Sequence, residues 1–267
     1  MHGFCLSIIL SLLFCLFYDL QELHPPLVEE CPICLESIPV TSFMSVHPLL
    51  CCGNMFCYKC YRESFARNTV IQVCPLCRSD LIIDSNETIS LTIKQALNGK
   101  AWAQASMGYL YLYGLKCQDG DAARNNGIER DMDQAVKWLE LAAEQRYPCA
   151  IRMLAQMYLG LYDHLDGENG DVRCRVDKAK ARALMKQAAD MGNLSAQRHM
   201  GMACRLCQGD EEESAHYYTL AFSHKDVEDG KSDYFTLNNA PTEEIIHAAH
   251  YLGEFYYFGT GGFSRNL

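Results

Sequence analysis

The stretch that decides the fold runs from Cys31 to Cys77 and reads Cys31-Pro-Ile-Cys34, then Leu50-Cys51-Cys52-Gly-Asn-Met-Phe-Cys57-Tyr-Lys-Cys60, then Cys74-Pro-Leu-Cys77. Eight of the chain's fifteen cysteines fall within these forty-seven residues. Each C-x-x-C pair forms a short knuckle that puts two sulfurs on one side of a turn, and two such pairs complete a tetrahedral Zn(II) site. The stretch therefore predicts two structural zinc ions, each bound by four cysteines with no coordination position open for catalysis.

A disulfide framework is the competing interpretation, because cysteine-rich segments of secreted proteins are often cross-linked. The proline, glycine and apolar residues at the knuckle positions favour metal instead. Zinc thiolates also predict a reducing compartment, and we therefore expect a cytoplasmic protein.

The order and spacing of the cysteines resemble a RING finger, the zinc-binding domain of one large class of ubiquitin ligases. Sixteen residues separate the first pair from Cys51 and thirteen separate Cys60 from Cys74, which lies within the family's range. The family interleaves its ligand pairs, so that pairs one and three share one ion and pairs two and four the other. The resemblance implies a first site of Cys31, Cys34, Cys57 and Cys60 and a second of Cys51, Cys52, Cys74 and Cys77.

The second ligand pair departs from the family's common pattern. Asn54, a poor zinc ligand, occupies the slot that usually holds a histidine. A minority all-cysteine variant has a cysteine directly before the glycine, which makes Cys52 the fourth ligand and Cys51 the third. Adjacent cysteines reach one ion only with some distortion of the backbone, so His47 stays open as an alternative third ligand.

Four residues bear on activity through the same resemblance. In active RING ligases an apolar residue of the first knuckle, a residue of the following helix and the proline of the last knuckle form a shallow groove for the ubiquitin-conjugating enzyme. These correspond to Ile33, Phe65 and Pro75. Arg78 follows the last ligand, where the family often has a basic linchpin that contacts both the conjugating enzyme and its ubiquitin, and a guanidinium suits several fixed donor contacts. The alternative is that Ile33 and Pro75 only pack the knuckles and that Arg78 is a solvated loop charge.

The length and composition set limits on the rest of the chain. A chain of 267 residues suggests two domains. Its formal charge of -10 argues against a nucleic-acid partner, because phosphate binding needs clustered Lys and Arg. Its hydrophobic content of 49% is ample for a globular core.

Residues 1–28 are expected to be an apolar amino-terminal segment and linker, with an almost unbroken apolar run and no charge at residues 3–18. Sixteen residues fall short of the roughly twenty that cross a bilayer comfortably. A cleavable signal would need a basic region and a small-residue cleavage site. A membrane anchor with the finger in the cytosol, a signal peptide and a spurious extension of the reading frame therefore stay open.

The finger is expected over residues 29–84 and a linker helix over residues 85–98, with its helical part from Thr88 to Leu97. Asn98-Gly99 is a signal for a helix end. Beyond it, the pattern A-x-x-x-[LM]-[GA]-x-x-[YC] occurs four times, starting at Ala103, Ala150, Ala196 and Ala248. The anchors are 47, 46 and 52 residues apart, a period that predicts a solenoid of small units.

The first three units have a second half, in which apolar residues again recur at helical spacing. The repeats should therefore be antiparallel helix pairs. Small residues such as Gly108 and Ala142 would allow close approach, and Tyr111, Trp138 and Tyr158 would fill the space between units. The loops inside the units are long and polar, at residues 115–130, 161–176 and 226–241.

Residues 99–267 resemble Sel-type (SLR) repeats, relatives of the tetratricopeptide repeat. The pattern A-x-x-x-L-G-x-x-Y-x-x-G, followed by D-x-x-K-A and a second helix, recurs in register. The last copy has only its first helix. Further positions on the pattern are Gly114, Asp131, Gly160, Asp177, Gly192 and Gly259.

Nothing in the sequence points to a side-chain nucleophile or a nucleotide-binding loop. Cys204-x-x-Cys207 is expected in a repeat helix, and we interpret its cysteines as small buried residues. We expect a small zinc-stabilised ββα RING domain followed by an all-α solenoid of antiparallel helix pairs.

The function expected from both resemblances is that of a RING-type ubiquitin ligase without a covalent intermediate. It would bind a ubiquitin-conjugating enzyme with its ubiquitin on the finger and a protein substrate or adaptor on the repeats. A non-catalytic zinc-binding scaffold is one alternative. A membrane-anchored quality-control component, attached through residues 3–18, is the other.

Overall fold

The computed structural model describes residues 28–40, 46–65, 73–81, 85–114, 128–162, 176–208, 210–223 and 240–263. These residues belong to two compact units, one within Leu27–Met185 and one within Lys186–Leu267. The apolar run at residues 3–18 lies outside the described residues, as do most of the three long loops. No helix in the described parts of the chain is both long enough and apolar enough to span a membrane.

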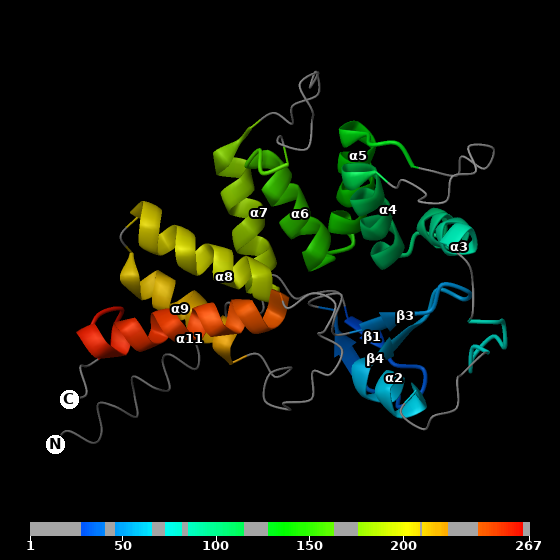
Figure 1. Cartoon of the computed structure of the whole chain (residues 1–267), viewed down its shortest axis with the longest axis horizontal. Helices are drawn as coiled ribbons and strands as arrows, with labels where there is room; N and C mark the ends of the chain where they lie inside the picture. Colours follow the sequence, from blue (N-terminus) through cyan, green and yellow to red (C-terminus); the bar gives the residue numbers. More distant parts are fainter. Residues whose placement is uncertain are drawn as a thin grey trace. The chain divides into compact units, whose positions relative to one another are not determined.

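The first unit begins with a small β-rich domain (Figure 1). Strands β1 (Val28–Glu30) and β2 (Ser37–Pro39) form one antiparallel pair. Strands β3 (Val46–Pro48) and β4 (Met55–Cys57) form a second, and helix α2 (Tyr58–Phe65) follows directly. Each strand is three residues long, so these ladders alone provide few hydrogen bonds to hold the domain.

Helix α3 (Ser85–Leu97) connects this domain to the repeats and begins three residues before the predicted Thr88. Its end is the predicted one. Gly99 has a φ of 81°, and the backbone N–H of Lys100 donates to the carbonyl of Gln95 at 3.0 Å. A left-handed glycine after the last turn is a common helix stop.

The first three repeat helices of the first unit pack against one another in succession (Figure 1). Gly108 has its expected role, since a Cβ there would lie 2.5 Å from Cγ of the buried Leu139 in the facing helix. The aromatic residues Tyr111, Trp138 and Tyr158 are partly buried and pack against the core. The helices are α4 (Ala101–Tyr113), α5 (Met132–Glu144), α6 (Pro148–Tyr158) and α7 (Lys178–Asp190), whose last five residues fall in the second unit.

The repeat pattern has a clear local cause in its aspartates. Asp131 accepts a hydrogen bond from the backbone N–H of Gln134 at 2.9 Å, which caps helix α5. Its own N–H donates to the carbonyl of Tyr111 at 2.9 Å. Asp177 makes the same pair of bonds one repeat later, to Lys180 and Tyr158. The aspartate thus caps the second helix and connects it to the end of the first.

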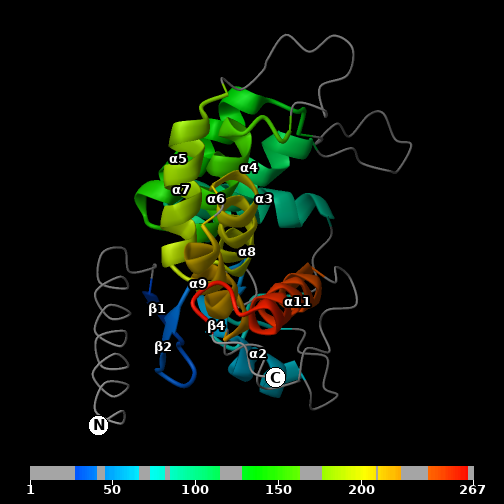
Figure 2. The same cartoon turned by 90° about the vertical axis from the view of Figure 1, so that its left-hand side faces the viewer.

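The second unit contains helices α8 (Leu194–Ala203), α9 (Glu211–Phe222) and α11 (Ala240–Phe258), which lie side by side (Figure 2). Tyr218 and Phe255 are buried in its core, and Gly201 lies against the Tyr218 ring. The strands of the amino-terminal domain and the helices of both units confirm the predicted order, a β-rich cysteine domain followed by helical repeats.

One local prediction was wrong. Cys204-x-x-Cys207 is not in a regular repeat helix but in the π-helical turn η2 (Cys204–Gln208). Cys204 is buried, as expected, and the Cys207 side chain lies outside the described residues. Asp210 then caps helix α9 by accepting from Glu213 N–H, and its own N–H donates to the Cys204 carbonyl at 3.2 Å. The π turn thus leads into the same aspartate cap as in the other two repeats.

Candidate metal centre

Eight thiols of the amino-terminal domain gather in two groups. In each group the four sulfurs lie within 4.8 Å of one another. The grouping follows the interleaved order that the RING resemblance implies. The first group is Cys31, Cys34, Cys57 and Cys60, and the second is Cys51, Cys52, Cys74 and Cys77.

Two of the cysteine pairs lie in closely similar knuckles. The N–H of Leu35 donates to the Cys31 carbonyl at 2.8 Å, and the N–H of Arg78 donates to the Cys74 carbonyl at 2.9 Å. Leu35 and Arg78 have φ angles of 61° and 62°. Each first cysteine also donates its N–H five residues ahead, to Glu36 or Ser79. The positive φ of Arg78 is therefore part of the knuckle.

A third turn, with the same pattern of backbone hydrogen bonds, contains the adjacent pair Cys51 and Cys52. The N–H of Gly53 donates to the Leu49 carbonyl at 2.7 Å, and the N–H of Leu49 donates to the Asn54 carbonyl at 2.8 Å. Gly53 has a φ of 74°. In this turn Cys52 corresponds to the second cysteine of a knuckle, but Leu49 occupies the first cysteine's position. The remaining thiol comes from Cys51, at the position that Ile33 and Leu76 hold in the other knuckles.

The pKa values of the thiols reflect their burial, their hydrogen bonds and the neighbouring thiols. Burial raises the pKa of Cys31, but backbone N–H donors outweigh burial and lower it to about 6. Hydrogen bonds at Ser79 lower the pKa of Cys77 to about 6. Burial, followed by the neighbouring thiols, raises the pKa of Cys51 and Cys60. Four thiols this close cannot all become thiolates without a cation among them.

A zinc ion supplies that positive charge and displaces the thiol protons. Two groups of four cysteines therefore fit two zinc ions. None of the eight cysteines in these two groups forms a disulfide. The role of each single cysteine as a ligand stays a prediction.

The alternative ligand His47 lies elsewhere in the domain. Its ring stacks on Tyr61 with the centroids 3.7 Å apart, and it is not a member of either group. Burial lowers its pKa. Asn54, in the usual histidine slot, donates its side-chain N–H to the Cys52 sulfur at 3.3 Å. Cys51 thus completes the second group of thiols, and Asn54 donates a hydrogen bond to a thiol of that group.

The residues expected to contact a conjugating enzyme lie beside the knuckles. Ile33 is 43% exposed, and Pro75 and Arg78 are exposed as well. Phe65 is the last residue of α2, and its side chain lies outside the described residues. Sequence reasoning missed Leu76, which is 37% exposed at the tip of the last knuckle. Its position between Cys74 and Cys77, equivalent to that of Ile33, was the available signal.

The repeats of the first unit carry an aromatic patch, defined here as Tyr109, Tyr113 and Tyr162. The rings of Tyr109 and Tyr113 lie 4.5 Å apart, and those of Tyr113 and Tyr162 lie 5.9 Å apart. Tyr109 and Tyr113 are exposed. The Tyr162 hydroxyl donates to Gln156 Oε1 at 2.7 Å, which fixes the third ring. Such a patch is suited to contact with another protein.

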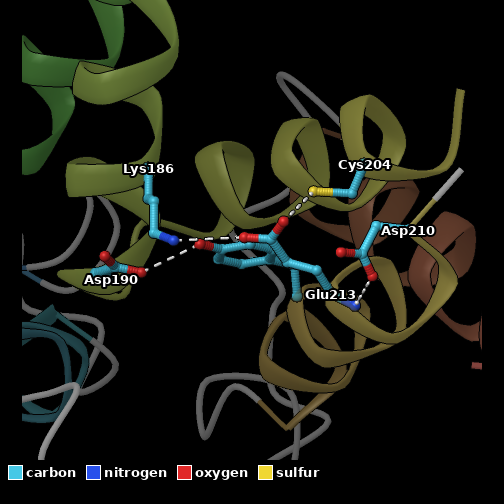
Figure 3. Close-up of polar contacts among 6 residues, drawn as sticks. Lys186, Asp190, Cys204, Asp210 and Glu213 are labelled. Carbon is cyan, nitrogen blue, oxygen red and sulfur yellow. Dashed lines mark hydrogen bonds and ion pairs between the residues drawn. The ribbon is translucent and has the colours of Figure 1, made fainter. Parts of the chain in front are cut away.

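The second unit has a polar cluster between its helices (Figure 3). Glu213 accepts from the Cys204 thiol at 3.3 Å and forms an ion pair with Lys186 at 3.4 Å. Asp190 accepts from the Tyr217 hydroxyl at 3.3 Å. Its members come from the last residues of α7, the π turn and α9, so we interpret the cluster as a structural link within the second unit.

Comparison with known families identifies both parts of the chain. A family model for the Ring finger domain matches residues 29–78, and one for the Sel1 repeat matches residues 103–147, 154–193 and 246–267. The chain therefore contains a RING-type zinc finger followed by Sel1 repeats. The third copy, formed by α8 and α9, lies outside the matched ranges. These domains point to binding of other proteins.

Similar solved structures include repeat proteins from bacteria. A Sel1 repeat protein from Oxalobacter formigenes is 25% identical, with a TM-score of 0.48, over 68% of this chain and 42% of that one. The antigen c5321 of uropathogenic Escherichia coli, which has an SLR fold, is 20% identical with a TM-score of 0.29. The match covers 68% of this chain and 39% of that one. The chain thus spans about two fifths of these two proteins. A search of curated proteins found no match.

Proposed function

We propose that this protein is a RING-type ubiquitin ligase that acts without a covalent intermediate. The finger recruits a ubiquitin-conjugating enzyme with its ubiquitin, and the repeats hold a protein substrate or adaptor. The chain contributes by positioning, since an oriented thioester is attacked faster by a substrate lysine amine. Bound zinc supplies structure alone, because four thiolates leave no open coordination position.

The observation that carries this proposal is the exposure of apolar side chains at the knuckle tips. Ile33 and Leu76 are 43% and 37% exposed, which argues against a role confined to packing the knuckles. Contiguous exposed apolar side chains often mark a binding site, and Ile33 and Leu76 hold equivalent positions in their two knuckles. Arg78 uses its backbone N–H in the knuckle and keeps an exposed side chain, and a guanidinium suits a shared contact with enzyme and ubiquitin.

Autoubiquitylation of the full chain in vitro, with a broad panel of conjugating enzymes, tests the proposal. Ile33→Ala and Arg78→Ala should each reduce the rate by about 5- to 30-fold, since each removes a contact worth roughly 1–2 kcal/mol at a small interface. Both variants should keep two zinc ions.

Matched controls come from the repeats. Leu141→Ala removes an apolar side chain that is 44% exposed on α5, and Arg182→Ala removes an exposed arginine of α7. Both should retain wild-type activity. Equal activity in all variants, or no activity of the wild type across the panel, would leave a non-catalytic zinc-binding scaffold as the better description.

For the repeats, the aromatic patch is the surface we propose for the substrate or adaptor. A Tyr109→Ala/Tyr113→Ala variant should keep autoubiquitylation, because the finger is untouched. In cells it should lose modification of the protein partner, as measured by mass spectrometry of ubiquitin remnants against the wild type. Unchanged modification would exclude this surface.

We propose a cytoplasmic location, since thiolate zinc sites require reducing conditions. Fractionation of a tagged protein with and without residues 1–20 tests attachment to membranes. Recovery of the full chain, but not the shortened one, with membranes would favour the membrane-anchored quality-control role.

A further inference from the structure

The turn that carries Cys51 and Cys52 is bound from outside the zinc finger. The Gln95 side chain of α3 donates from Nε2 to the carbonyls of Leu50 and Cys51, at 3.0 and 3.3 Å. Trp102 of α4 donates from Nε1 to the Gly53 carbonyl at 3.4 Å. Both side chains are 3% exposed. Helices α3 and α4 therefore fix three carbonyls of this one turn.

The fit between the turn and α3 is close. A Cβ at Gly53 would lie 2.4 Å from Gln95 Oε1, so the glycine leaves room for the glutamine as well as for its own positive φ. The finger and the first repeat also share one continuous apolar core, which includes Met55 and Trp102. The contact is thus a packed interface within a single unit.

This turn needs external support more than the other knuckles do. In the knuckles of Cys31 and Cys74 the thiols come from positions one and four, and the turn's own hydrogen bonds set their separation. In the third turn Leu49 holds position one, and the thiols come from the adjacent Cys51 and Cys52. Adjacent side chains tend to point apart, so their convergence depends on the exact backbone path.

We propose that Gln95 and Trp102 are positioning residues for the second zinc site, Cys51, Cys52, Cys74 and Cys77. The metal affinity of this site then depends on the helices that begin the repeat array. The first site, Cys31, Cys34, Cys57 and Cys60, does not. This inference needs zinc binding but not ligase activity, so it stands or falls independently of the function proposed above.

Zinc competition with the full-length chain tests the proposal. Gln95→Met keeps the volume of the side chain and removes its donors. In this variant the protein should bind one of its two zinc ions about 10- to 100-fold more weakly, which is the usual effect of losing a group that supports a ligand. A chromogenic chelator should therefore remove that ion at a lower chelator concentration than it needs with the wild type. Trp102→Phe keeps an aromatic ring, removes one N–H and should weaken binding of the same ion by a smaller factor.

The matched control is Gln104→Met. Gln104 is also buried, and its Nε2 donates to the Ala96 carbonyl within the same helical junction, at 3.4 Å. This variant should hold both ions as the wild type does. Alkylation of thiols during the competition, followed by mass spectrometry, identifies the weakened site, because the cysteines of the second group should react first.

Three results would overturn the inference. One is wild-type affinity for both ions in Gln95→Met and Trp102→Phe. Another is equal weakening of both sites, which would indicate a general loss of the finger's fold. The third is a Gln104→Met variant that behaves as Gln95→Met does, since the effect would then come from the junction as a whole.

Discussion

The zinc finger and the repeat array achieve stability in different ways. The finger has three-residue strands and only a minor apolar cluster of its own, around Leu49, Phe56 and Tyr61, while other buried finger residues such as Val40 and Met55 join the core of the first repeat. The array has helices of ten or more residues, with many alanines and methionines fully buried between them. A domain with so small a core needs metal, whereas the array stabilises itself by packing. The comparison implies that each region fails under a different perturbation.

Removal of metal should produce the largest difference between the two regions. Structural zinc contributes on the order of 10 kcal/mol, so a strong chelator should unfold the finger and leave most of the helical array folded. Hydrogen exchange should then rise in β1–β4 and α2 while far-ultraviolet circular dichroism changes little.

Single cysteine variants sharpen this first prediction. Cys57→Ser should lose at least one zinc ion, whereas Cys149→Ser, at a buried thiol of α6, should keep both. Atomic spectroscopy of the purified variants would measure their zinc content. In the chelator experiment, unchanged hydrogen-exchange protection of the finger would contradict the claim that the finger depends on metal.

A packing change should affect the array and spare the metal. Gly108→Ala forces a methyl group against the buried Leu139 and the Ala135 carbonyl, 3.3 Å away, and should lower the free energy of unfolding by about 1–3 kcal/mol. Urea denaturation would measure it. Gly253→Ala is the control, because a Cβ there meets nothing within 4 Å and should raise helix stability by up to about 1 kcal/mol.

Loss of one aspartate cap should have a smaller effect. Asp131→Ala removes the acceptor for the Gln134 N–H and should cost about 1 kcal/mol of unfolding free energy. Asp133→Ala, in the same first turn but without the capping role, should cost a few tenths of a kcal/mol. Equal effects in urea denaturation would mean that the repeated aspartate acts through charge alone.

Lowering the pH should affect the finger and the repeat array through different titrating groups. The finger should release zinc as pH falls, because protons compete for the thiolates. In the array, burial lowers the pKa of His216 below its ordinary value of 6.5. The His216 imidazole therefore binds a proton more readily in the unfolded chain than in the folded one. As a result, neutral His216 contributes to the free energy of unfolding above pH 6.5, and this contribution is lost as the pH falls below that value.

His216→Gln should remove this small contribution. Relative to their values at pH 8, the unfolding free energies of variant and wild type should diverge below pH 6.5, with the variant losing less. Parallel curves from pH 8 to 5 would show that His216 does not contribute to the acid sensitivity of the array.

Much of the architecture was predictable because its signals are local. Cysteine spacing indicated the finger, and the four-fold pattern indicated the helix pairs, their close contact at Gly108 and the end of α3 at Gly99. The π turn at Cys204 was missed, since a helical spacing of apolar residues does not distinguish an α-helix from a single π turn. The start of α3 was missed by three residues because Ser85, Asn86 and Glu87 are polar and suit a linker equally well.

By itself, the sequence determined the two kinds of domain, a set of cysteines that fits two zinc ions, and the grouping of all but one of the eight thiols. Only the tertiary structure decided that Cys51, and not His47, completes the second group, and that Leu49 takes the place of a knuckle cysteine. It also revealed that Gln95 holds this turn from 44 and 45 residues away. Knuckles and helix caps are encoded within a few residues, whereas these choices depend on hydrogen bonds and packing between segments that meet only after folding.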